Sequence, residues 1–191
     1  MPTAGKGQIV VISGPSGVGK STVCARLCER LPAEFSVSYT TRPIRPGEVD
    51  GQDYRFVQPA EFDRLLADGG LLENARVYGH SYGTPLMPVR RALAEGRTIV
   101  LEIDIHGTIQ VRSACPAART FFLLPPNPDE QRRRIEGRRT DAQAEIARRL
   151  ARADGEIGYA RESACYDRFI VNDDLERTLD EIIGILRSEN K

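Results

Sequence analysis

Short apolar segments alternate with segments of helical periodicity along most of the chain. Continuous runs rich in Val, Ile, Leu and Phe predict four buried strands, at residues 8–14, 97–104, 118–126 and 167–173. Apolar residues at helical spacing predict helices at 21–31, 61–70, 88–96, 127–139, 142–160 and 175–190. Strands separated by helices are typical of parallel βαβ units, so we expect an α/β fold with a parallel sheet flanked by helices.

Two segments interrupt this alternation. Residues 35–85 are more polar and contain short strand patterns of their own, which predicts an inserted lobe. The arginine-rich helical pair within 127–152 predicts a second attachment. A core with two mobile attachments is suited to closure over ligands. We therefore expect one domain over residues 1–191, whose core consists of 1–34, 86–126 and 153–191.

Charge and composition limit the possible partners. The chain has 27 Lys and Arg residues and 27 Asp and Glu residues, so its formal net charge is zero. It therefore has no global field to attract nucleic acid or an acidic membrane, and any anion must be bound by a local cluster. No apolar run approaches the length of a membrane span, and the N-terminal apolar run is too short for a signal peptide. The four cysteines form no C-x-x-C pair and are best explained as small packing residues in a reducing compartment. We expect a cytoplasmic protein.

A phosphate-binding motif joins the first predicted strand to the first predicted helix. Residues 14–21, GPSGVGKS, match G-x-x-x-x-G-K-[ST] in the required context. In such a loop the backbone N–H groups and the helix N-terminus face phosphate oxygens. Lys20 would reach the β and γ phosphates, and the Ser21 hydroxyl can ligate Mg²⁺. We predict an ATP site formed by Gly14, Pro15, Ser16, Gly17, Val18, Gly19, Lys20, Ser21 and Thr22.

A second candidate site begins at residues 38–54, SYTTRPIRPGEVDGQDY. Arg42 and Arg45 offer planar, bidentate donors that suit a phosphate monoester. The alternative is a solvated turn in which the two arginines pair with nearby carboxylates, Glu48 and Asp50. A P-loop in the same chain favours the anion site, because a kinase needs an acceptor opposite its nucleotide.

Other polar residues of the lobe complete this picture. Tyr54 and Tyr82 can donate neutral hydroxyl hydrogens, and together with the two arginines they describe a clamp for a dianion. Glu73, with the hydroxyl of Thr84 nearby in the lobe, describes a group that recognises the edge of a base.

The pattern S-x-T-T-R-x-x-R-x-G-E-x-x-G-x-D-Y-x-F-V at 38–57 closely resembles the guanylate kinase signature. The resemblance extends over nearly the whole chain, through LLENARVYGHSYGT, LEIDIHG, LLPP, RIEGRRT and IVNDD. It implies a P-loop nucleoside monophosphate kinase fold with a GMP-binding lobe at 35–85 and a helical lid at 127–152. It also implies reversible, Mg²⁺-dependent phosphoryl transfer from ATP to GMP or dGMP.

The resemblance also implies roles for individual residues. Ser38, Glu73 and Thr84 would contact guanine, and Arg42, Arg45, Tyr54 and Tyr82 the GMP phosphate. Glu102 and Asp104 would belong to the same substrate site. The lid arginines Arg134, Arg138 and Arg149 would approach the ATP phosphates, and Asn172 would lie near the ATP base. The chain departs from the family pattern in having Glu102, His106 and Arg139 where aspartate, glutamine and glycine are common.

Two other functions compete with this interpretation. A guanylate-kinase-like scaffold domain that binds proteins would tend to lose P-loop residues, but this chain retains Gly14, Gly19, Lys20 and Ser21. A related kinase of another phosphorylated metabolite, such as a ribose bisphosphate, would not need the three residues expected at guanine. The sequence is compatible with either a monomer or a homo-oligomer.

Overall fold

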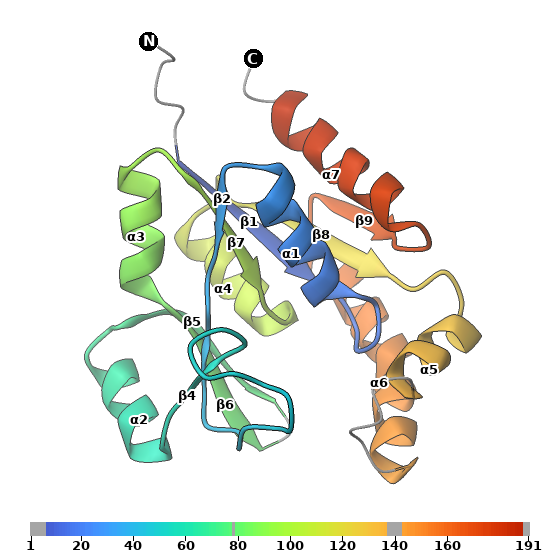
Figure 1. The fold of residues 1–191 in the computed structure, drawn as a ribbon, viewed down its shortest axis with the longest axis horizontal. Helices are drawn as coiled ribbons and strands as arrows, with labels where there is room; N and C mark the ends of the chain where they lie inside the picture. The colour runs from blue at the N-terminus through green and yellow to red at the C-terminus, as the bar shows by residue number, and fades with distance from the viewer. Residues whose placement is uncertain (1–6, 78, 137–142, 189–191) are drawn as a thin grey trace.

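The central feature of the fold is a parallel sheet with strand order β2-β7-β1-β8-β9 (Figure 1). The structure, a computed structural model, describes residues 7–77, 79–136 and 143–188. The strands of this sheet are β1 (Gln8–Ser13), β2 (Ala33–Phe35), β7 (Thr98–Glu102), β8 (Arg119–Leu124) and β9 (Arg168–Val171). All neighbouring pairs are parallel, which confirms the predicted α/β class. The strand β2 was not expected in the core sheet, because its three residues form no apolar run.

The central strand β1 is buried on both faces. Alternate residues of a strand point to opposite sides, and here they enter two separate apolar layers. Val10 and Ile12 pack with residues of α1 (Lys20–Arg30) and α7 (Leu175–Ser188). Ile9 and Val11 pack with residues of α3 (Leu86–Ala94) and α4 (Ile105–Ala114). Cys24 is buried in the first layer, as expected for a packing residue.

Helix α4 was missed by the sequence analysis, which places no helix between residues 104 and 118. Its sequence, IHGTIQVRSA, mixes β-branched, polar and glycine residues, so its apolar periodicity is weak. The helix starts at Asp104, whose side chain accepts a hydrogen bond from the backbone N–H of Gly107 at 2.8 Å. It forms the crossover between β7 and β8 and projects its N-terminal end toward the inserted lobe (Figure 1).

The inserted lobe contains a four-stranded sheet with order β4-β3-β6-β5. Its elements are β3 (Tyr39–Thr40), β4 (Arg55–Phe56), α2 (Pro59–Ala67), β5 (Leu71–Val77) and β6 (His80–Pro85). Strands β5 and β6 form an antiparallel hairpin, and β5 lies at the edge of the sheet. In Figure 1 the lobe lies below the core and next to α4, on the side of the carboxyl ends of β1 and β7.

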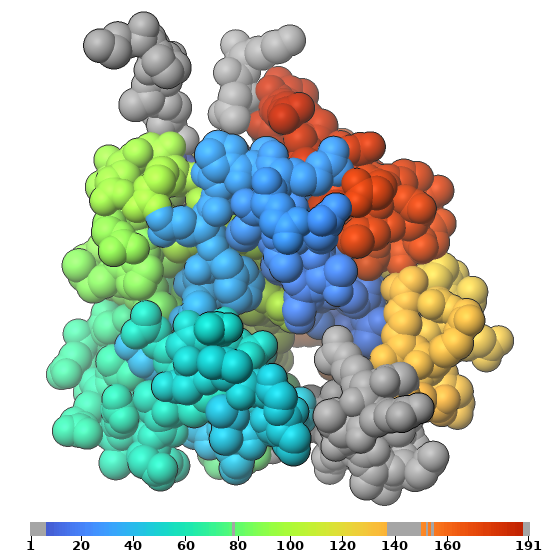
Figure 2. All heavy atoms as spheres, viewed as in Figure 1, coloured from blue at the N-terminus to red at the C-terminus, as the bar shows by residue number. Residues whose placement is uncertain are grey.

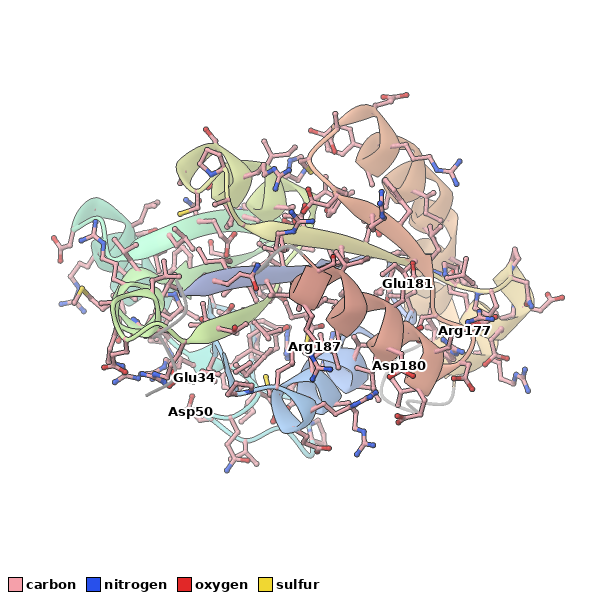
Figure 3. The ribbon with its side chains drawn as sticks, turned by 90° about the horizontal axis from the view of Figure 1, so that it is seen from above. Glu34, Asp50, Arg177, Asp180, Glu181 and Arg187 are labelled. Atoms are coloured by element: carbon pink, nitrogen blue, oxygen red, sulfur yellow. The ribbon has the colours of Figure 1, made fainter. Side chains whose placement is uncertain are left out.

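The second attachment consists of α5 (Pro128–Glu136) and α6 (Gln143–Glu162). Helix α6 is continuous across residues 152–153, where the sequence analysis places the boundary between lid and core. Helix α7 packs against α1, and its Asp180, labelled in Figure 3, accepts a hydrogen bond from Arg30 of α1 at 2.6 Å. None of the described helices is long and apolar enough to cross a membrane.

Candidate active site

A cavity of about 1220 Å³ lies between the core and the inserted lobe. It is visible in Figure 2 as a hollow below α1, beside the lobe residues drawn in cyan. The cavity brings together residues from the P-loop, the ends of β1 and β7, the start of α4, the lobe and α6. The sequence-predicted residues along its wall are Gly14, Ser16, Lys20, Ser21, Ser38, Arg42, Arg45, Tyr54, Glu73, Tyr82, Glu102 and Asp104.

The P-loop connects β1 to α1. Gly19 has a φ of 94°, and a Cβ at this position would lie 2.8 Å from Asn172 Nδ2, so a larger residue is excluded on both counts. The Lys20 ammonium donates hydrogen bonds to the carbonyls of Gly14 at 2.8 Å and Pro15 at 3.1 Å. The lysine is therefore folded over its own loop, in a position to exchange these neutral acceptors for phosphate oxygens.

Ser21 and Glu102 form the part of the site that fits a metal ion. The Ser21 hydroxyl donates to Glu102 Oε1 at 3.1 Å, although the two residues come from α1 and β7. A hydroxyl and a carboxylate are oxygen ligands of the kind that Mg²⁺ prefers. No group of three or more His, Cys, Asp or Glu side chains suited to a metal occurs among the described residues. An ion here would need further ligands from nucleotide phosphates and water. Glu102, predicted as part of the GMP site, therefore lies within hydrogen-bond distance of the P-loop serine.

The P-loop is braced from behind by Asn172. Its side-chain amide donates to the Val18 carbonyl at 2.7 Å and accepts a hydrogen bond from the Thr178 hydroxyl at 3.1 Å. The residue is only 6% exposed. Arg134, a predicted lid arginine, donates a hydrogen bond to the Asn172 backbone carbonyl at 3.0 Å. On α5, Gln131 donates to the Ser16 carbonyl at 2.8 Å.

Two of these residues, Arg134 and Asn172, line a second, smaller cavity of about 300 Å³. Its wall includes Gly17, Gly19, Thr22, Arg134 and Asn172, and none of these described residues lines the larger cavity. The predicted lid arginine Arg138 lies outside the described residues. Arg149 belongs to α6, but its side chain also lies outside the described part of the structure.

In the lobe, Arg42 is held by a carboxylate. Its guanidinium donates to the two Glu48 oxygens at 2.7 and 3.0 Å, and to the Pro43 carbonyl at 2.7 Å. The Arg42 side chain is only 9% exposed, so the arginine–carboxylate pair expected for a solvated turn is formed but is largely buried. Burial lowers the pKa of Arg42, but the hydrogen bonds with Glu48 outweigh it and raise the pKa above its ordinary value. The guanidinium is therefore a permanent cation at the cavity wall.

Two tyrosines stand next to this cation. The Arg42 guanidinium carbon lies 5.4 Å from the centre of the Tyr54 ring, and Tyr54 packs edge-on against Tyr82 at 5.8 Å. Burial, with the nearby Glu102 charge, raises the pKa of Tyr54 well above its ordinary value. Tyr54 is thus a neutral hydrogen-bond donor throughout the physiological range. Arg45 also lines the cavity, while its backbone N–H donates to Glu48 at 2.8 Å.

Glu73 is the most buried carboxylate at the cavity wall, with 4% of the residue exposed. Its Oε1 accepts hydrogen bonds from the Thr84 hydroxyl at 2.6 Å and the Thr84 backbone N–H at 3.0 Å. Burial, together with the Asp104 charge, raises the pKa of Glu73 to about 7 against the opposing effect of Thr84. Thr84 does not line the cavity, so in the structure it holds the carboxylate. Ser38 also lines the cavity.

A family model described as Guanylate kinase matches residues 6–189. The chain belongs to the guanylate kinase family. A guanylate kinase of Thermosynechococcus vestitus is 50% identical over 174 residues, which cover 91% of this chain and 90% of that protein. A guanylate kinase of Thermus thermophilus is 45% identical over 186 residues, covering 97% and 83%. The crystal structure of guanylate kinase from Anaplasma phagocytophilum has a TM-score of 0.79 at 36% identity, covering 96% of this chain and 86% of that one.

Membership of the guanylate kinase family confirms the resemblance carried by residues 38–57. Two residues that organise the site were given no role from that resemblance, because they contact other protein residues and were not expected to meet a substrate. Gln131 holds the P-loop and Glu48 holds Arg42. Glu48 is a fixed position of the 38–57 pattern, three residues after Arg45, but its side chain was considered only as a partner in a solvated turn.

Proposed function

We propose that this protein transfers a phosphoryl group from ATP to GMP and dGMP, reversibly and with Mg²⁺, as an enzyme of purine nucleotide metabolism in the cytoplasm. The observation that carries the proposal is the position of Glu73 and Arg42 in the same cavity as the P-loop. A base-reading carboxylate and a phosphate-binding cation on one side, with a triphosphate loop on the other, provide the two sites that a nucleoside monophosphate kinase needs.

Glu73 is suited to guanine. An ionised carboxylate only accepts hydrogen bonds, and guanine presents two adjacent donors, N1–H and the N2 amine. Adenine has an acceptor at N1 and no amine at C2, so AMP would place a lone pair against the carboxylate. Discrimination by buried groups left without partners can reach about 10⁴-fold. Thr84 fixes one oxygen of the carboxylate, and Ser38 is available to the other edge of the base.

The acceptor phosphate would be bound by Arg42, Arg45, Tyr54 and Tyr82. Arg42 already presents a fixed guanidinium plane, and neutral tyrosine hydroxyls can donate to a dianion without adding charge. The phosphate of GMP is itself a nucleophilic dianion, so the transfer needs no strong base. Asp104 caps α4 near Glu73 and supports the guanine side of the site.

On the donor side, we assign the β and γ phosphates of ATP to the P-loop and Lys20. Mg²⁺, held by Ser21 and Glu102 when bound, would neutralise charge on the transferring phosphate. The small cavity beside Arg134 and Asn172 suits the base of ATP, with the guanidinium of Arg134 at its wall. Arg138 and Arg149 remain assigned to the ATP phosphates on the family resemblance.

The geometry favours catalysis by positioning. Donor and acceptor phosphates must lie in line, and water must be excluded, since it would compete with GMP for the transferred group. The cavity is open between the core and the lobe, so we expect the lobe and the lid to approach each other when both substrates are bound.

The proposal is tested by a coupled assay of ADP formation with ATP and a panel of acceptors. GMP and dGMP should be used, whereas AMP and ribose phosphates should be used at rates lower by on the order of 10³-fold or more. Omission of Mg²⁺ should abolish turnover. A protein that binds ATP but phosphorylates none of the acceptors would point to a scaffold, and preference for a ribose phosphate would point to the other kinase.

A further inference from the structure

Gly107, in the first turn of α4, lies directly against the carboxylate of Glu73. A Cβ built on Gly107 would be 2.4 Å from Glu73 Oε2 and 3.0 Å from its Cδ. Contacts this short do not occur in real proteins, so any side chain at residue 107 would force the carboxylate to move. The oxygen concerned is Oε2, whereas Thr84 holds Oε1. The two oxygens of Glu73 are therefore confined from different directions by Thr84 and by the surface of α4.

The backbone of Gly107 does not itself require glycine. Its φ is not among the positive values in the chain, and it occupies a regular helical position after Asp104. Alanine is a better helix former than glycine, so the helix alone would favour a larger residue here. The close approach to Glu73 is then the structural feature that requires glycine.

One helical turn further along α4, Gln110 binds the residue next to Glu73. Its amide nitrogen donates to the Asn74 carbonyl at 2.7 Å, and its amide oxygen accepts from the Asn74 N–H at 3.1 Å. Strand β5 is the edge of the lobe sheet, so these backbone groups face away from β6. The glutamine side chain thus pairs with the strand edge as a neighbouring strand would.

We propose that Gly107 and Gln110 form one docking surface of α4 that positions Glu73 for guanine. Residues three apart on a helix share a face, so the pairing of Gln110 with Asn74 sets where β5 lies along the helix. Because Gly107 has no side chain, the carboxylate of Glu73 can occupy the space beside it. Neither residue is a catalytic residue, since each acts through Glu73. The proposal rests on the proposed function, because it concerns selectivity for the same base.

The first test is Gly107→Ala. We expect the variant to fold with unchanged or higher Tm, and kcat/KM for GMP to fall on the order of 10- to 100-fold, mainly through KM. The KM for ATP should stay within about twofold, and the ratio of GMP to AMP use should narrow. The matched control is Gly184→Ala in α7, where a Cβ would meet nothing within 4 Å. It should raise helix stability in the same way and leave GMP use unchanged.

A double-mutant cycle separates a local effect on Glu73 from a general effect on the helix. Adding Gly107→Ala to Glu73→Ala should change GMP binding, measured by calorimetry, by less than about twofold, because the clashing carboxylate is gone. If Gly107→Ala weakens GMP binding equally in both backgrounds, or has no effect in the parent, the docking role of Gly107 is wrong. A parent enzyme that does not phosphorylate GMP would instead refute the proposed function.

Gln110 is tested by two substitutions. Gln110→Leu removes both hydrogen bonds to Asn74 at similar size, and Gln110→Glu retains only the acceptor. We expect the KM for GMP to rise about tenfold in the first and less in the second, with the KM for ATP unchanged. Gln58→Leu, at an exposed residue preceding α2, is the control for the same chemical change in the lobe. An equal loss for ATP and GMP in Gln110→Leu would show a structural role only.

Discussion

The donor and acceptor halves of the cavity are organised in opposite ways. On the acceptor side, two charged side chains are each held by another side chain: Glu48 holds Arg42, and Thr84 holds Glu73. On the donor side the P-loop surface is mainly backbone, and the lysine of the loop, Lys20, binds the carbonyls of its own loop. Arg42 and Glu73 are therefore fixed by protein contacts, whereas Lys20 has to exchange its carbonyl partners to bind phosphate.

This difference matches the ligand that each half has to recognise: a triphosphate on the donor side and one particular nucleobase on the acceptor side. Many proteins bind triphosphates through backbone N–H groups, which cannot read a base and need only the correct loop shape. Selection of one nucleobase requires fixed side chains whose burial makes a wrong partner costly. The acceptor half accordingly carries the buried charges of the cavity, and the support of the donor half lies behind the loop, at Asn172 and Gln131.

The largest expected effect is on Lys20. Lys20→Ala removes the only side-chain charge of the P-loop, and kcat should fall on the order of 10²-fold or more because charge on the transferring phosphate is no longer stabilised. GMP affinity should be unchanged, since the lysine belongs to the donor half. The control is Arg26→Ala, an exposed cation on the same helix. Wild-type turnover in Lys20→Ala would remove the donor site from the P-loop.

A second, smaller effect is expected at Arg42. Arg42→Lys retains the charge but loses the planar fork that binds both Glu48 oxygens, so kcat/KM for GMP should fall on the order of 30-fold. ATP affinity, measured by calorimetry, should not change. Arg55→Lys, an exposed arginine of the same lobe, is the control and should behave as the parent. An equal loss of ATP affinity would mean that the two halves are not organised separately.

The support behind the P-loop predicts a third effect, confined to ATP. Asn172→Ala removes the shorter of the two side-chain hydrogen bonds to the Val18 carbonyl and opens space beside Gly19, so ATP affinity should fall about tenfold. Thr178→Val retains the amide but removes the hydroxyl that orients it, and its effect should be smaller. GMP affinity should be unchanged in both variants. A fall in GMP affinity alone would contradict the bracing role.

The smallest effect is a pH dependence on the acceptor side. Guanine needs the ionised form of Glu73, whose pKa is raised to about 7, so GMP affinity should increase a few-fold as the pH rises from 6 to 8. The GMP phosphate loses its second proton near pH 6 as well. Glu73→Gln removes only the first titration, so the difference between parent and variant isolates Glu73. Parallel pH profiles of the two proteins would show that Glu73 stays ionised throughout.

The same titration affects stability in the opposite direction. Because the pKa of Glu73 is higher in the folded than in the unfolded protein, protonation favours the fold. This contribution is fully present below about pH 4.5 and is lost as the pH rises through about 7. The glutamine variant lacks it, so its Tm should change less between pH 5 and 8 than that of the parent. The proposed mode of GMP binding therefore uses the ionised form of Glu73, which burial in the fold disfavours.

Sequence patterns predicted the elements whose residues interact with near neighbours or form long apolar runs. The strands containing Val10 and Phe121 were found because they are buried on both faces and are almost entirely apolar. Helix α4 was missed because Gly107 and Gln110 serve the lobe, and this interrupts the apolar periodicity of the helix. A helix could still have been inferred there, since two parallel strands need a crossover connection.

For the candidate site, too, the sequence predicted the local motifs and missed the contacts between distant residues. The P-loop and the residues at 38–54 follow motifs, so their chemistry was visible in the sequence. The contacts between distant residues were not visible: Ser21 with Glu102, and Val18 with Asn172, join segments that are 81 and 154 residues apart. Such pairs depend on which strands are neighbours in the sheet, and a single sequence does not contain that order.

The position of β1 in the middle of the sheet also affects how the protein is made. Strand β1 leaves the ribosome first among the core strands, but its partners are Thr98–Glu102 and Arg119–Leu124. About 85 residues separate the end of β1 from the first of these partners, which at 5–20 residues per second corresponds to roughly 4 to 17 seconds of synthesis. During that interval an apolar strand has both edges unpaired. We therefore expect the nascent chain to bind a chaperone over residues 8–13, and the P-loop to become able to bind phosphate only after that interval has passed.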